Sequence, residues 1–98
     1  MTDYAKKLDE FISRAEAIRG KLALAAKSEV VADDVKKLTS DMMAALENCT
    51  DEMFYPAVYN GAATIRSAPE KCSVAQLSDA LSDAAEEMKL MAEYVGSL

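Results

Sequence analysis

Apolar side chains recur at alternating intervals of four and three residues along the first quarter of the chain. This spacing places one side chain per turn on a single face of a helix. Thr2 or Asp3 provides a side chain that can cap the start, and Gly20 weakens a helix without breaking it. The sequence therefore predicts an amphipathic helix over residues 3–27. Its apolar positions are Tyr4, Leu8, Phe11, Ala15, Ile18, Leu22 and Ala25.

A second apolar series with the same spacing follows. It consists of Val31, Val35, Leu38, Met42, Ala45 and Cys49. Ser28 and Asp33 compete as N-caps, and the acidic pair Asp33–Asp34 suits the positive end of a helix dipole. We expect a helix over residues 33–49, with Ser28 as the alternative start.

The last quarter of the chain carries the clearest start signal. Ser73 and Gln76 stand at the interval of a capping box, in which each side chain accepts a hydrogen bond from a free backbone N–H group. The helix that they open is expected to reach Tyr94, where Gly96 is placed to end it. Its apolar positions are Val74, Leu77, Leu81, Ala84, Met88, Met91 and Val95.

Residues 50–72 are ambiguous between a helix and a structured loop. Phe54, Val58, Gly61 and Ile65 keep helical spacing, but Pro56 removes a backbone donor and Asn60–Gly61 is a common turn pair. We favour a short helix over residues 52–66, kinked near Pro56 and followed by a turn at Ser67–Ala68–Pro69. The predicted fold is thus all-α, one domain over residues 1–98 that forms a small antiparallel bundle of four helices. A three-helix bundle is the alternative.

The two cysteines distinguish these two topologies. A helix of about fifteen residues between them would be about 22 Å long. Cys49 and Cys72 would then lie near opposite ends of a four-helix bundle, as free thiols. In a three-helix bundle both fall at one end, where a disulfide becomes geometrically feasible.

Charge narrows the classes of partner. Residues 1–49 hold nine acidic and eight basic residues, a net charge of −1, whereas residues 50–98 hold eight and three, a net charge of −5. A negative surface is repelled by phosphate backbones and by anionic lipids. We therefore expect no direct binding to nucleic acid or membrane, and the charge is compatible with a basic protein partner. The N-terminal residues lack the apolar core of a secretory signal, which favours a cytoplasmic location.

The residues of common catalytic and metal sites are missing. The chain has no histidine, its three glycines are far apart, and no serine is followed by lysine three residues later. The sequence therefore predicts a non-enzymatic protein without a cofactor or a metal ion.

Four carboxylates recur along the predicted outer face of the last helix, namely Asp79, Asp83, Glu86 and Glu93. Residues a heptad apart are separated by about 10 Å along a helix, too far for ligands of one ion. Carboxylates on a helix usually form a solvated face. The functional interpretation of this acidic strip is a docking site for a basic partner, including imitation of nucleic-acid charge.

Three large apolar residues, Leu24, Met43 and Leu90, lie off the predicted core stripes. Such residues are commonly exposed singly, but if they converge they would form a patch for homodimerisation or partner binding. Phe54, Tyr55 and Tyr59 gather half of the aromatic residues and, with nearby methionines, could also enclose a ligand.

Three functions remain open at this point. The leading hypothesis is a small acidic protein–protein interaction module, either monomeric or homodimeric. The first alternative is an acidic inhibitor or decoy, for example phage-encoded, that blocks a basic nucleic-acid-binding surface. The second is a carrier of a small ligand.

Overall fold

The first helix, α1, runs from Tyr4 to Leu22 in the computed structural model, which describes residues 3–25, 27–66 and 73–95. Asp3 is its N-cap and accepts a hydrogen bond from the backbone N–H of Lys6 at 3.0 Å. The helix ends five residues before the predicted end. The backbone N–H groups of Leu24 and Ala25 donate to the carbonyls three residues back, so the last turn is tighter than an α-helical turn and the α-helix ends there.

The second helix, α2, runs from Ala32 to Ala45 and is preceded by a 3-10 turn, η1, from Ser28 to Val31. Both predicted starts fall within a helical segment, but the predicted caps are wrong. Lys27 precedes η1 and Val31 precedes α2, neither with a side-chain cap hydrogen bond, and Asp33 lies inside the first turn of α2. The predicted end at Cys49 is too late, because further tight turns follow Ala45 and Asn48 has a φ of 60°. Asparagine tolerates this left-handed conformation better than most residues, and it commonly ends helices.

The third helix, α3, spans Phe54–Ile65 and confirms the short helix predicted in the ambiguous segment. Asp51 Oδ1 accepts hydrogen bonds of 2.9 Å from the backbone N–H groups of both Met53 and Phe54. Pro56 is the third residue of α3, where a backbone N–H has no acceptor within the helix, so its missing donor requires no break. The predicted turn at residues 67–69 lies outside the described residues.

The last helix, α5, runs from Val74 to Ala92. Its predicted capping box is present. Ser73 Oγ accepts from the Gln76 N–H at 3.2 Å, and Gln76 Oε1 accepts from the Ser73 N–H at 3.0 Å. The helix ends two residues before the predicted Tyr94, and Gly96 lies outside the described residues.

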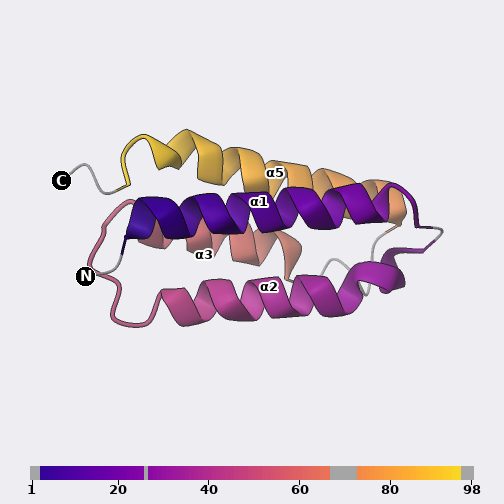
Figure 1. Cartoon of the computed structure of the whole chain (residues 1–98), viewed down its shortest axis with the longest axis horizontal. Coiled ribbons are helices and arrows are strands. Elements are labelled where there is room, and N and C mark those ends of the chain that lie inside the picture. The colour runs from indigo at the N-terminus through magenta and orange to yellow at the C-terminus, as the bar shows by residue number, and fades with distance from the viewer. Residues whose placement is uncertain (1–2, 26, 67–72, 96–98) are drawn as a thin grey trace.

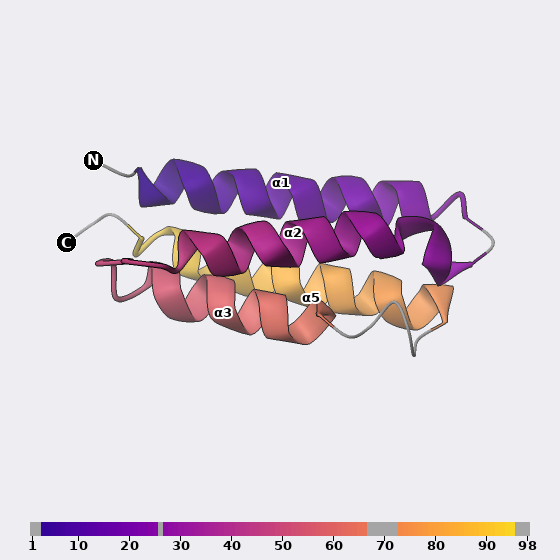
Figure 2. The ribbon, with the colours of Figure 1, turned by 90° about the horizontal axis from the view of Figure 1, so that it is seen from below.

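The four α-helices of the described residues run alternately up and down, which confirms the antiparallel four-helix bundle (Figure 1). Following the perimeter, α1 packs on α2, α2 on α3, α3 on α5 and α5 on α1, so that α2 and α5 lie diagonally across the bundle (Figure 2). The predicted apolar stripes meet in one buried core. Its largest fully buried side chains are Leu8, Phe11, Leu22, Val31, Val35, Leu38, Met42, Phe54, Ile65, Leu77, Leu81 and Met88.

Of the two cysteines that were predicted to lie at opposite ends of the bundle, the described residues include Cys49 alone. Cys49 is half-buried in the α2–α3 connection, and its thiol donates to the Asp51 carbonyl oxygen over 3.5 Å. This connection and the start of α5 lie at opposite ends of the bundle (Figure 1). Cys72 lies outside the described residues, so the state of the pair stays a prediction.

Candidate functional site

The acidic strip of the sequence lies on the outer face of α5. Asp79, Asp83, Glu86 and Glu93 are all exposed. Within the described part of the chain, none of these four carboxylates forms an ion pair or accepts a hydrogen bond. No group of three Cys, Asp or Glu side chains among the described residues is arranged to hold a metal ion. The strip is therefore negative, solvated and unengaged by the rest of the fold.

A large apolar side chain lies within this acidic strip. Leu90 stands four residues after Glu86 and eleven after Asp79, so helical geometry places it on the same face. Its relative exposure is 69%, which leaves most of a leucine in water. Tyr94 follows four residues later and is also exposed. The outer face of α5 consequently combines negative charge with an exposed apolar residue.

Polar contacts to α1 lie along one edge of this face. Lys89, the single basic residue between Val74 and Ala92, pairs with Glu16. Arg19 Nε donates a hydrogen bond of 3.3 Å to Ser78 Oγ. These polar contacts join α5 to α1, and Arg19 and Lys89 line a small pocket at this edge together with Glu86. Asp79, Asp83 and Glu93 do not line this pocket.

Leu24, Met43 and Leu90 do not converge into the apolar patch that was considered from the sequence. Leu24 is 92% exposed just beyond the C-terminal end of α1, whereas Met43 is half-buried near the C-terminal end of α2. Leu90 belongs to α5, diagonally across the bundle from α2. The three residues therefore contribute to three separate surfaces, and Leu90 joins the acidic strip.

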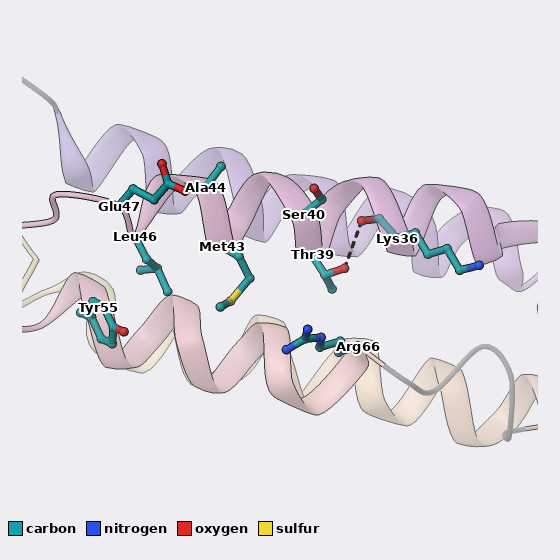
Figure 3. Close-up of a pocket in the computed structure, with 9 residues that line it drawn as sticks. All are labelled: Lys36, Thr39, Ser40, Met43, Ala44, Leu46, Glu47, Tyr55 and Arg66. Atoms are coloured by element: carbon teal, nitrogen blue, oxygen red, sulfur yellow. Dashed lines mark hydrogen bonds between the residues drawn. The ribbon is translucent and has the colours of Figure 1, made fainter.

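A groove with a cavity volume of about 750 Å³ runs between α2 and α3 (Figure 3). Met43 points into it from α2, and Tyr55 lies across from Leu46 at one end. Thr39 is satisfied internally, since its hydroxyl donates to the carbonyls of Val35 and Lys36. The residues that line the groove are Lys36, Thr39, Ser40, Met43, Ala44, Leu46, Glu47, Tyr55 and Arg66.

The two ends of this groove differ in charge. Since α2 and α3 are antiparallel, Lys36 near the start of α2 and Arg66 at the end of α3 share one end. Glu47 and Tyr55 share the other end. Sequence reasoning missed Glu47 and Arg66 as site residues, because single charged residues beside loops carry no signal until the helix pairing is known.

The aromatic cluster divides between core and surface. Phe54 is fully buried, and its ring lies 4.8 Å from that of Tyr4, tilted by 47°. Tyr55 and Tyr59 are exposed and stack on each other, with ring centroids 6.0 Å apart. The three rings therefore do not enclose a common cavity, and of the three only Tyr55 lines the α2–α3 groove.

No described helix has the length and apolar character required to cross a bilayer. Comparison of the chain with protein-family models, with curated protein sequences and with solved structures finds no match.

Proposed function

We propose that this chain is a small acidic, non-enzymatic protein-binding module that recognises a basic partner through the outer face of α5. The observation that carries the proposal is the placement of Leu90, 69% exposed, among four carboxylates that have no partner within the described residues. The carboxylates alone would be sufficient to keep a monomer soluble. The exposed leucine does not add to solubility, and association with a partner would remove its side chain from water.

The two kinds of side chain would contribute different terms to binding. Carboxylates on a rim accelerate encounter with a positive surface and reject acidic proteins, but they add little net affinity in water. A leucine that enters an apolar pocket contributes about 2 kcal/mol of hydrophobic free energy. The partner should therefore present basic residues around an apolar pocket that receives Leu90.

A decoy that imitates nucleic-acid charge remains a second proposal for the same face. It shares the requirement for Asp79, Asp83, Glu86 and Glu93, because a basic nucleic-acid-binding surface would be attracted by these charges. It makes no use of Leu90, since a phosphate backbone offers no apolar side chain to imitate. Leu90 is therefore the residue that separates the two proposals.

The test measures binding of a purified partner, first captured with the wild-type protein from host extract, to three variants. The first reverses the strip, with Asp79, Asp83, Glu86 and Glu93 changed to Lys. The second, Leu90→Ser, removes the apolar side chain alone. We expect the reversal to abolish binding and Leu90→Ser to raise the Kd by about 30-fold.

The third variant is the matched control. It reverses four other exposed carboxylates, those of Asp9, Glu29, Asp33 and Glu52, and so has the same net charge as the first. We expect it to retain binding. Equal loss in both reversal variants would mean that net charge alone drives capture, and the α5 site would be rejected. Loss on strip reversal with no effect of Leu90→Ser would favour the decoy.

A further inference from the structure

The α2–α3 groove carries opposite charges at its two ends. Arg66 is exposed at the end of α3, and Glu47 is exposed just after α2, about 16 Å away along the helices. Neither the guanidinium nor the carboxylate forms an ion pair within the described residues. The groove therefore presents one unpaired positive group and one unpaired negative group on the same face of the bundle.

Met43 lies between these two charges, and aromatic rings lie toward the negative end of the groove. Met43 projects into the groove from α2, and Tyr55 lines it from α3 (Figure 3). Tyr59 stands one turn after Tyr55 and stacks on its ring, and both rings are about half exposed. Tyrosine and methionine are enriched in protein interfaces, where a flat aromatic ring contributes large contact area with few rotatable bonds.

We propose that this face binds a second copy of the same chain. A two-fold axis perpendicular to α2 and α3 superimposes the positive end of one groove on the negative end of the other. This axis lays α2 on α2 and α3 on α3 of the partner, so Lys36 and Arg66 of one copy lie at the end that carries Glu47 of its partner, and Met43 of both copies lies near the centre. A two-fold axis parallel to the helices would instead place the two positive ends together and the two negative ends together. The charge pattern therefore selects the arrangement in which the helices of the two copies are antiparallel.

The dimer would be reversible. The face is two helices wide and about 16 Å long. Each copy would therefore bury much less area than the about 800 Å² that each partner contributes to a standard interface. The net charge of −6 on each copy also opposes association at low ionic strength. We therefore expect a Kd in the micromolar range that improves as salt screens the general repulsion.

The dimer face is separate from the outer face of α5, because α2 and α5 lie diagonally across the bundle (Figure 2). The inference therefore does not depend on the proposed function. If both surfaces are used, a dimer would present two acidic strips, and a partner with two basic sites would gain avidity.

Sedimentation velocity across the micromolar range tests the proposal through a charge swap. Both positions are exposed, so substitutions there leave the core intact. Arg66→Glu replaces one of the two cations at the end that faces Glu47 of the partner with a carboxylate, and Glu47→Arg places a third cation at that end. Each single variant should raise the dimer Kd by about 10-fold, and the double variant should restore it to within about 3-fold of wild type.

Two further variants fix the face. Tyr59→Ser removes an exposed ring and should also weaken the dimer. The double variant Lys6→Glu with Asp9→Lys makes equivalent charge changes on α1, away from the groove, and should leave the Kd unchanged. A protein that stays monomeric throughout, or single variants without effect, or a charge swap that fails to restore the dimer, would overturn the proposal.

Discussion

A Cβ atom built on Gly61 would lie 3.3 Å from Cε of Met42. It would also lie 3.6 Å from the Cγ and sulfur atoms of Met88, and both methionines are fully buried. At Gly61, therefore, α3 lies close to buried side chains of both α2 and α5. The missing side chain serves helix packing here, and the Asn60–Gly61 pair, a common turn signal, lies inside α3.

The two helical glycines should respond differently to alanine. Gly20 is exposed in α1, and nothing lies within 4 Å of an added Cβ, so Gly20→Ala should raise the free energy of unfolding by about 1 kcal/mol through helix propensity. Gly61→Ala has the same intrinsic gain, but Met42 must shift its terminal methyl by a few tenths of an ångström. We expect a smaller gain, at most about 0.5 kcal/mol. Urea denaturation followed by circular dichroism measures both values, and equal gains would show that the close approach imposes no constraint.

Leucines on the inner and outer faces of α5 provide a matched pair. Leu81 is fully buried and Leu90 is mostly exposed. Leu81→Asp would bury an unpaired carboxylate, which costs more than a domain of this size can offset, and the protein should lose cooperative thermal unfolding. Leu90→Asp should melt within a few degrees of wild type. Cooperative melting of the Leu81→Asp protein would show that the assigned inner face of α5 is wrong.

The inner faces of the helices were predictable because burial in a bundle follows helical spacing closely. Leu8, Leu38 and Leu81 all lie in the core, as their positions in the apolar series predict. The ends of α1 and α2 were not predictable from spacing, because Ala25 and Cys49 continue each series beyond the last helical turn. Tight turns that reverse the chain set these helix ends, and the spacing of apolar residues does not reveal where such turns begin.

The candidate surfaces were predictable only where one helix supplies all the residues. The acidic strip lies on α5 alone, so its spacing is sufficient to place it on one face. The proposed patch failed because Met43 and Leu90 belong to helices that are diagonal in the bundle, and spacing within a helix does not reveal which helices are neighbours. Arg66 and Glu47 were missed for the same reason.

The capping box of α5 should contribute measurably to stability. Ser73→Ala removes the acceptor of the Gln76 N–H and should lower the free energy of unfolding by about 1 kcal/mol. Ser13→Ala, at an exposed position within α1, is the control and should leave stability unchanged or slightly raised. A difference between the two variants below the error of chemical denaturation would mean that α5 begins without help from its cap.

The ion pairs that join α1 to α2 should make a small, salt-dependent contribution. Arg14 and Asp41 are 2.9 Å apart, and the arginine side chain is 29% exposed. Lys21 and Asp34 are 2.8 Å apart, but the lysine is 57% exposed, so water screens this pair more strongly. Double-mutant cycles to alanine should give a coupling of about 0.5–1 kcal/mol for the first pair and less for the second. Both values should fall as salt is raised, because the Debye length shortens. A coupling for Arg14–Asp41 that is independent of salt would indicate that packing of the arginine stem, not charge, joins the two helices there.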